Sequence, residues 1–488
     1  MNTDAPWTDL AEARQRVLGM QTKLHRWSRR DATARFDDLF NLVVDPAFLR
    51  VAWERVAGNT GARSAGIDGL TARAIETRYG WLDFLTDLRQ QVKSAVFMPS
   101  PVKQRKIPKS PGKYRILGIP TVADRVVQAS LVLVLEPIFE ADFCPSSYGF
   151  RPRRRAQDAV SEIQMFASRS FEWVFEADIT ACFDEIDHTA LMGRVRRRVG
   201  DKRVLTLVRA FLKAGALSED QILRRTDTGT PQGGILSPLL ANIALEVLDE
   251  HFARVWNASS ATRVDRSRRR RRGEPIFRLV RYADDFVVLV SGKREHAEAL
   301  WQQTADILAP LGLRLSVEKT QVVHIDDGFD FLGFRIQRHP KPGTSTSFVY
   351  TFPSRKSMTS VCRKVKAITK QGTNQPLSEV LRQLNLLLRG WTRYFQHGCP
   401  SGPSATCVTT AGVGLSSGCA ESTAGPDGRL CGGAIPPRDG GRNTQGLPCS
   451  TPPRYGSPAI ATGATSRHRG HNHHRLVNRH DLVESRMR

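Results

Sequence analysis

The stretch IFRLVRYADDFVVLV, residues 276–290, places two runs of β-branched and aromatic residues on either side of Asp284 and Asp285. Runs of this composition are typical of strands, and the acidic pair between them predicts a tight turn. Two adjacent carboxylates at the tip of a hairpin repel one another unless a cation neutralises them. Carboxylate oxygens suit Mg²⁺, with Mn²⁺ as an alternative, so this stretch predicts a divalent metal site on a β-sheet.

A second candidate strand, residues 173–177, ends directly before Asp178. Neighbouring strands that each deliver an Asp provide the minimum for two metal ions ~3.5–4 Å apart, an arrangement that supports in-line phosphoryl transfer. An isolated Asp pair is more often a solvated turn, but apolar strands on both sides favour a rigidly supported site. Asp184 and Asp187 lie near an expected helix start, where a capping function is the better interpretation.

The size and charge of the chain narrow the class of partner. Its 488 residues are enough for two or three domains, and 40% hydrophobic with 25% charged residues exclude a mainly disordered or fibrous chain. The 72 basic residues against 48 acidic ones give a net charge of +24, which predicts a polyanionic partner. Nucleic acid is favoured over membrane, because no run approaches the ~20 apolar residues of a spanning helix. Without a signal peptide pattern, we expect a cytoplasmic protein.

The last 90 residues, 399–488, have a different composition from the rest. They hold 14 of the 38 Gly, 9 of the 27 Pro and 5 of the 8 Cys but no Lys, so they cannot build an ordinary core. Their Cys spacing contains no CxxC pair, which argues against a zinc module. We expect this tail to be disordered or translated out of frame. Cys144, Cys182 and Cys362, which precede it, are expected to be reduced thiols.

Hydrophobic periodicity in residues 1–398 predicts a mixed architecture. Helices are expected over 4–30, 47–57, 122–139 and 377–395, and a basic loop and strand over 102–119. With the acidic hairpin and the strand before Asp178, this pattern predicts a mixed class, α/β or α+β.

YADD at residues 282–285, together with ADITACFD at 177–184, resembles the catalytic palm of reverse transcriptases, specifically those encoded by bacterial group II introns. Seven further blocks follow the order of that family. They are NTGARSAGIDGLT (59–71), KIPKSPGKYRILGIPTVADRVVQ (106–128), SSYGFRPRRRAQDAV (146–160), TGTPQGGILSPLLANIAL (228–245), LSVEKTQ (315–321), FDFLGF (329–334) and LRGWTRYF (388–395).

The resemblance implies an α+β right-hand polymerase with fingers, a palm built on an antiparallel sheet, and a helical thumb. It divides the chain into an N-terminal extension with the start of the fingers (1–100), fingers (101–172), palm (173–345), thumb with the start of a maturase domain (346–398) and the atypical tail (399–488). It implies an RNA-directed DNA polymerase that extends a primer 3′-OH with two Mg²⁺ ions, and that acts in group II intron mobility, intron RNA binding and splicing.

The partners that the resemblance implies are group II intron RNA, a DNA target or primer, and dNTPs. When bound to DNA, such a protein is nucleoid-associated. The oligomeric state is not indicated. Two alternatives stay open: a non-catalytic splicing cofactor that only binds intron RNA, and a degenerate copy with impaired splicing. Three converging acids argue against the first alternative, because RNA binding alone does not require them.

By the same resemblance, Asp178, Asp284 and Asp285 form the metal-binding triad, with Asp178 and Asp284 as the direct ligands of both ions. Lys109 and Arg115 match fingers residues that grip the incoming triphosphate.

Phe183 matches the aromatic residue that selects deoxynucleotides, although core packing is its ordinary use. Gln232 is the choice for the nucleotide pocket, and Lys319 matches the residue that protonates or orients the leaving pyrophosphate. Gly229 and Gly233, which flank Gln232, are expected to allow close backbone approach to nucleotide or template.

The run RSRRRRRG at residues 266–273 contains Arg268, Arg269 and Arg270, for which we expect contact with RNA phosphates. A disordered, self-repelling insertion is the alternative. Arg389 is expected to bind RNA, whereas Trp391 in the same segment is expected to pack against a helix.

Overall fold

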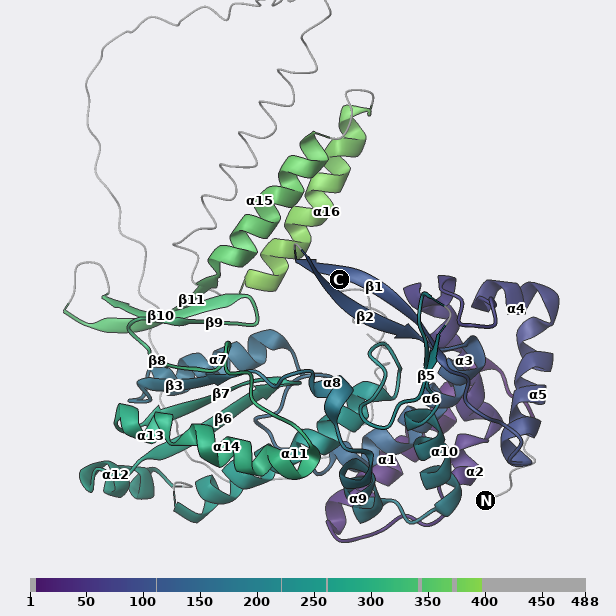
Figure 1. Ribbon diagram of the computed structural model, residues 1–488, viewed down its shortest axis with the longest axis horizontal. Coiled ribbons are helices and arrows are strands. Elements are labelled where there is room, and N and C mark those ends of the chain that lie inside the picture. The colour runs from purple at the N-terminus through teal and green to yellow at the C-terminus, as the bar shows by residue number, and fades with distance from the viewer. Residues whose placement is uncertain are drawn as a thin grey trace, which may run out of the picture. The chain divides into compact units, whose positions relative to one another are not determined.

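The computed structural model describes residues 6–110, 112–220, 222–259, 262–340, 345–370 and 375–396 (Figure 1). The tail 399–488, with its five Cys, lies outside the described residues. The chain forms two compact units. The first contains the chain up to Ser360 and a segment that begins at Tyr394, and the second contains residues 361–393.

The helices of the first unit are α1 (Leu10–Arg30), α2 (Phe40–Val43), α3 (Pro46–Gly58), α4 (Ala72–Arg78), α5 (Gly80–Lys93), α6 (Val122–Glu140), α7 (Ala156–Ala167), α8 (Cys182–Glu185), α9 (His188–Arg198), α10 (Lys202–Leu212), α11 (Ser237–Ser259), α12 (Arg263–Arg271), α13 (Arg294–Glu298) and α14 (Leu300–Leu308). The strands are β1 (Val102–Ser110), β2 (Lys113–Ile119), β3 (Trp173–Ala177), β4 (Ala216–Leu217), β5 (Leu223–Arg224), β6 (Ile276–Tyr282), β7 (Asp285–Ser291), β8 (Gln321–His324), β9 (Phe329–Phe331), β10 (Phe334–Pro340) and β11 (Ser347–Pro353).

The central sheet has the order β6-β7-β3-β8, with antiparallel pairing throughout. Its two faces are both apolar, because alternate side chains of each strand point to opposite sides. Phe175, Leu279 and Val288 join the core formed with α6 and α11, whereas Val174 and Val280 join a second core formed with α7 and strands β9 to β11. The sheet is therefore covered on both faces, which explains the near-continuous apolar runs in its strands.

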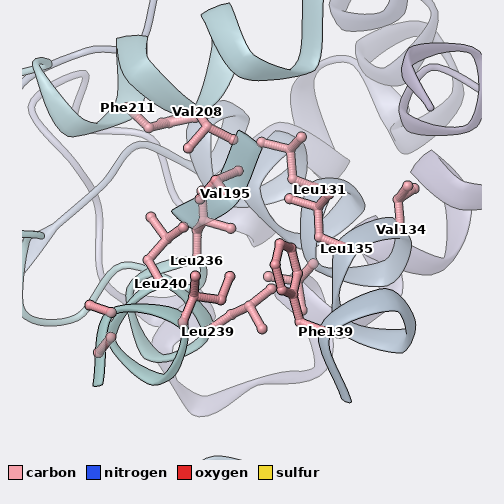
Figure 2. Close-up of a cluster of buried hydrophobic side chains, with 14 of the residues drawn as sticks. Leu131, Val134, Leu135, Phe139, Val195, Val208, Phe211, Leu236, Leu239 and Leu240 are labelled. Carbon is pink, nitrogen blue, oxygen red and sulfur yellow. The ribbon is translucent and has the colours of Figure 1, made fainter. Parts of the chain in front are cut away.

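The larger core lies where four helices converge (Figure 2). Helix α6 contributes Leu131 and Phe139, and is apolar around most of its circumference, as expected for a helix buried on all sides. Val195 of α9, Phe211 of α10 and Leu240 of α11 meet these side chains. This packing joins the helix that precedes β3 to the three helices that lie between β3 and β6.

Two smaller sheets complete the first unit. Strands β1 and β2 form an antiparallel ribbon that β4 and β5 extend, in the order β2-β1-β4-β5. Strands β9, β10 and β11 form a separate sheet in the order β11-β10-β9. The turn between β9 and β10 contains Gly333, whose φ of +80° suits a residue without a Cβ.

The second unit contains most of α15 (Arg355–Thr369) and α16 (Leu377–Phe395). Val361 and Val365 are the buried side chains of α15, and Leu384 is the buried side chain of α16. The bounds of α16 coincide with the predicted helix 377–395. No helix of the described residues is long and apolar enough to cross a membrane.

The mixed α+β class is confirmed, as are the helices predicted around 4–30, 47–57 and 122–139 and the hairpin at 276–290. The basic segment 102–119 forms two strands where one was expected. Cys144, Cys182 and Cys362 are free thiols.

Asp124, in the first turn of α6, is expected to make the stability of the fold depend on pH. Its carboxylate accepts bonds from the Thr121 hydroxyl (2.7 Å) and the Ser100 N–H (3.3 Å), but burial outweighs these bonds and raises its pKa to about 6. The folded state therefore binds a proton that the unfolded state releases near its ordinary pKa, so stability is greatest below about pH 4 and falls as the pH rises to about 6, by at most ~3 kcal/mol.

We expect Asp124→Asn to remove this loss. Relative to the unchanged chain, the free energy of unfolding of the variant should rise by ~1–3 kcal/mol between pH 4.5 and pH 7 in urea titrations. An equal difference between the two proteins at both pH values would show that Asp124 does not titrate in this range.

Candidate active site

The register of the central sheet brings the three predicted metal ligands together. Ala177 of β3 pairs with Phe286 of β7, so the next residue on each strand, Asp178 and Asp285, comes opposite the other. Tyr282 pairs with Asp285 across a two-residue turn, and that turn holds Asp284. The segment after β3 is fixed in turn, because the Ser316 N–H donates to the Asp178 carbonyl at 2.8 Å.

Burial and the neighbouring carboxylates raise the pKa values of Asp284 and Asp285. Burial, followed by repulsion from Asp178, raises the pKa of Asp284, while its own backbone N–H and the cations Arg115 and Lys109 oppose the shift. Asp285 keeps an exposed edge, but protein atoms packed around its carboxylate, followed by Asp284 and Asp178, raise its pKa to about 6. Ionised together, these groups need compensating positive charge.

Lys319 supplies part of that charge. Its ammonium group forms an ion pair with the Asp178 carboxylate, and this hydrogen bond is the main reason that the pKa of Lys319 is raised. The Lys319 side chain is 61% exposed, so the pair lies at the open side of the site. Lys319 was predicted to contact a leaving pyrophosphate, and it lies beside the triad.

The donor chemistry of the triad fits a hard divalent cation, since all its side chains offer carboxylate oxygens. In the described part of the chain, however, no three His, Cys, Asp or Glu side chains close into a ready-made metal cluster. The three acids of the triad thus interact electrostatically, and one of them, Asp178, is bound to Lys319. They do not form a complete set of three metal ligands.

Lys109 and Arg115 lie near the free end of the β1–β2 ribbon, and both side chains are exposed. Arg115 pairs with Ile107 across the ribbon, so these two side chains lie on the same face of the ribbon. Their electrostatic effect on Asp284 shows that both cations act on the triad.

Gln232 and the nearby Thr230 form hydrogen bonds to the segment that contains Phe183 and Asp184. The Gln232 amide donates to the Asp184 carboxylate at 2.9 Å, and the Thr230 N–H donates to the Phe183 carbonyl at 2.5 Å. Phe183 is half-buried and meets Phe150 edge-on, with ring centroids 6.3 Å apart. Asp184 was interpreted as a cap; it instead orients Gln232. Nothing in the sequence connects these two residues, which are far apart along the chain.

Asp187 does cap α9, as predicted, because its carboxylate accepts from the Ala190 N–H at 2.7 Å. Gly229 and Gly233 have a different explanation from the one predicted. A Cβ on Gly229 would stand 2.5 Å from the Asp184 carbonyl oxygen, and one on Gly233 would stand 2.7 Å from the Gly118 carbonyl oxygen. Both glycines, with φ of +79° and +107°, therefore allow close packing within the protein itself.

The arginine run forms helix α12, so the interpretation as a disordered insertion is wrong. Thr262 caps the helix by accepting from the Asp265 N–H at 3.1 Å. Arg269 pairs with Glu274 at 3.4 Å, and Arg270 donates to the Arg169 carbonyl at 3.0 Å. Arg268 is exposed to solvent.

Arg389 is exposed on α16 in the second unit, where Trp391 is half-buried.

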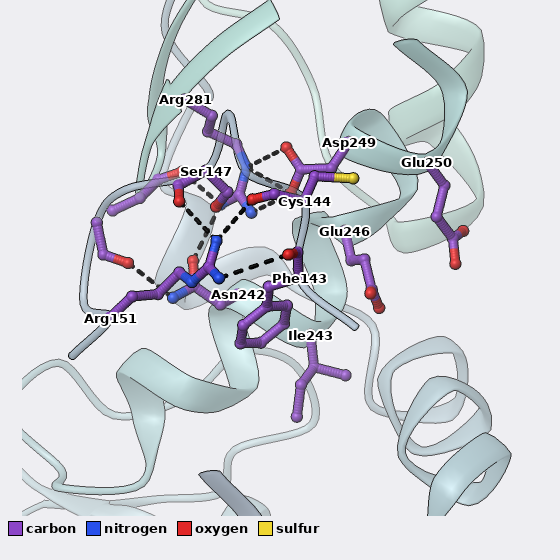
Figure 3. Close-up of polar contacts among 12 residues, drawn as sticks. Phe143, Cys144, Ser147, Arg151, Asn242, Ile243, Glu246, Asp249, Glu250 and Arg281 are labelled. Carbon is purple, nitrogen blue, oxygen red and sulfur yellow. Dashed lines mark hydrogen bonds and ion pairs between the residues drawn. The ribbon is translucent and has the colours of Figure 1, made fainter. Parts of the chain in front are cut away.

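The sequence analysis did not identify Arg281 and Asp249, whose side chains are both fully buried (Figure 3). The available signal was an Arg directly before YADD in a strand rich in apolar residues, because a buried charge at such a position requires a partner.

Two families of known proteins match two separate parts of the chain. Residues 107–336 match the family described as "Reverse transcriptase (RNA-dependent DNA polymerase)", and residues 358–406 match "Group II intron, maturase-specific domain".

Three relatives illustrate the similarity. Protein YkfC of Escherichia coli K12 is 35% identical over an alignment that covers 72% of this chain and 97% of that protein. Group II intron-encoded protein LtrA of Lactococcus lactis subsp. cremoris is 30% identical, over 66% of this chain and 60% of that protein. The putative COX1/OXI3 intron 2 protein of Saccharomyces cerevisiae is 25% identical, over 62% of this chain and 39% of that protein.

The matched reverse transcriptase region contains Asp178, Asp284 and Asp285, and it indicates a nucleotidyltransferase with a polymerase fold. The alignment with YkfC spans nearly all of that protein. The chain therefore belongs to the family of group II intron reverse transcriptases and maturases.

Proposed function

We propose that this protein is an RNA-directed DNA polymerase that extends a primer 3′-OH along an RNA template by phosphoryl transfer from dNTPs. The observation that carries the proposal is the pairing of β3 with β7, which sets Asp178 opposite Asp285 beside the Asp284 turn. Holding three carboxylates together on buried strands opposes their mutual repulsion, and this arrangement suits a site that binds cations and polyphosphate.

Asp178 and Asp284, assisted by Asp285, would hold two Mg²⁺ ions. When bound, such ions activate the attacking hydroxyl and neutralise charge on the transferred phosphoryl group. Lys109 and Arg115 bind the triphosphate from the exposed ribbon. Lys319, which shares its ammonium group with Asp178, can transfer its contact to the leaving pyrophosphate, because an exposed Lys reorients at little cost.

Gln232 and Phe183 form the wall of the nucleotide pocket in this proposal. Asp184 holds the Gln232 amide, and Phe150 supports the Phe183 ring from its edge. A ring fixed in this way presents a rigid surface to the sugar, which is the requirement for excluding a ribose 2′-OH.

We assign the fingers to residues 101–172, the palm to 173–345, and the thumb with the start of the maturase domain to 346–398. The maturase match supports intron RNA as a partner, and we place this protein in intron mobility and splicing. Arg268 on α12 and Arg389 on α16 are the proposed phosphate contacts, whereas Arg269 and Arg270 are engaged with protein groups and are secondary candidates.

A non-catalytic splicing cofactor is the alternative. It would have no use for a cluster of acids in which burial, followed by repulsion from Asp284 and Asp178, raises the pKa of Asp285 to about 6. Their retention on paired strands favours catalysis.

Asp284→Asn tests the proposal directly. Primer extension on RNA with Mg²⁺ and dNTPs should fall by roughly 10²-fold or more, because the change removes one anionic ligand and leaves the fold intact. Asp187→Asn is the matched control, since Asn caps a helix as well as Asp does. Undiminished extension by Asp284→Asn would refute the polymerase mechanism.

Phe183→Ala should relax sugar selection. Removal of the ring opens space beside the sugar, so incorporation of NTPs relative to dNTPs should rise by about tenfold or more in single-nucleotide extension. Phe150→Ala, which removes only the supporting ring, should give a smaller rise. An unchanged NTP-to-dNTP ratio in Phe183→Ala would assign Phe183 to core packing alone.

Arg268→Gln should weaken RNA binding mainly through salt dependence. The slope of log affinity against log salt concentration should fall by ~0.7–0.9 for one lost phosphate contact. Arg270→Gln should lower the slope less, because the Arg270 guanidinium already binds the Arg169 carbonyl and lies 6.0 Å from the Phe171 ring centroid. Identical slopes for the Arg268→Gln and unchanged proteins would exclude the contact.

A further inference from the structure

A buried guanidinium lies directly behind the acidic turn. Arg281 is in β6 two residues before Ala283, and it faces helix α11 with its side chain fully buried. Its Nε lies 3.0 Å from one oxygen of Asp249 and 3.1 Å from the other, and its Nη2 also bonds Asp249. Asp249 is equally buried, so the pair is fully desolvated and its geometry is tightly constrained.

The remaining nitrogen of Arg281 reaches the turn itself. Its Nη1 donates to the Asn242 side-chain oxygen at 3.0 Å and to the Ala283 carbonyl at 2.9 Å (Figure 3). Ala283 has a φ of +57°, a left-handed conformation that costs energy in a residue with a Cβ. One guanidinium thus joins a helix, through Asp249 and Asn242, to the strained residue next to Asp284.

This bond sets the direction of the following peptide group. Because a trans peptide is planar, the Ala283 carbonyl and the Asp284 N–H point in opposite directions. Arg281 holds the carbonyl on the buried side, so the Asp284 N–H points to the other side. The backbone direction at Asp284, from which its side chain projects, is therefore coupled to Arg281 through a single rigid unit.

A second segment of the chain, residues 146–149, also supports the turn. The Arg281 N–H donates to the Ser146 carbonyl at 2.9 Å, and the Tyr148 N–H donates to the Arg281 carbonyl at 2.8 Å. Asn242 donates to the Gly149 carbonyl at 2.8 Å. Gly149 lies so close to Ala283 that a Cβ on Gly149 would overlap the backbone nitrogen of Ala283.

We propose that Arg281 is a positioning residue for Asp284: held by Asp249 and Asn242, it fixes the peptide before Asp284 and so presents that carboxylate for cation binding. The inference rests on the proposed polymerase function. A purely structural buried ion pair would stabilise the fold but would leave cation affinity unchanged, and the two cases separate by measurement.

Arg281→Lys retains the charge next to Asp249 but loses the planar fork that reaches Asn242 and Ala283 at once. We expect direct Mn²⁺ binding, followed by electron paramagnetic resonance on the full chain without nucleotide, to weaken by ~10–100-fold. The Mg²⁺ concentration for half-maximal primer extension should rise in parallel, while primer–template affinity stays unchanged.

Arg194→Lys is the matched control. Arg194 also bonds α11, through the Ile243 carbonyl at 2.7 Å and Glu246 at 2.8 Å, but among the described residues it forms no hydrogen bond or ion pair with the turn or the triad. This variant should lose stability and keep Mn²⁺ affinity. Asn242→Ala, which spares the Arg281–Asp249 pair, gives a second and milder test, with Mn²⁺ binding weakened in the same direction.

Wild-type Mn²⁺ affinity in folded Arg281→Lys or Asn242→Ala, beside weakened binding in Asp284→Asn, would overturn the positioning inference and leave the polymerase proposal standing. Full primer extension by Asp284→Asn would instead overturn the polymerase proposal. Equal weakening by Arg194→Lys and Arg281→Lys would also count against positioning, because it would reveal a general effect of loosening α11.

Discussion

Mutual repulsion among Asp178, Asp284 and Asp285 is the constraint on which the rest of the structure depends. Carboxylates this close favour separation, so the surrounding chain has to hold them in place. Hydrogen bonding between β3 and β7 fixes two of the backbones, and apolar side chains on both faces of the sheet stabilise that pairing. Lys319 on one side and the cations of the β1–β2 ribbon on the other offset the negative charge.

Local sequence patterns predicted most of the fold. The strands around YADD, the buried helix α6 and the amphipathic helix α16 each carry their signal within one continuous segment. Such segments form the same element in almost any context, because their apolar residues repeat with the period of the element. The resemblance to group II intron reverse transcriptases supplied the identity of the triad, which periodicity alone could not distinguish from a solvated turn.

Features that depend on distant contacts were not predictable in this way. Asp184 meets Gln232 across 48 residues, and Asp249 meets Arg281 across 32. The glycines beside Gln232 were expected to face a ligand, but helix α8 and the β1–β2 ribbon occupy that space. In each case the residue type indicated an unusual requirement, and only the three-dimensional packing showed which group imposed it.

The carboxylates and the cations of the site lie on segments that differ in how deeply they are buried. The carboxylates follow strands buried on both faces, whereas Lys109 and Arg115 belong to a ribbon whose Tyr114 is 63% exposed and Ile116 is 48% exposed. Segments with few buried contacts have the lowest free energy of local opening. We therefore expect the cationic ribbon to open locally at a lower free-energy cost than the sheet, so that the carboxylates keep their geometry while the cations change theirs.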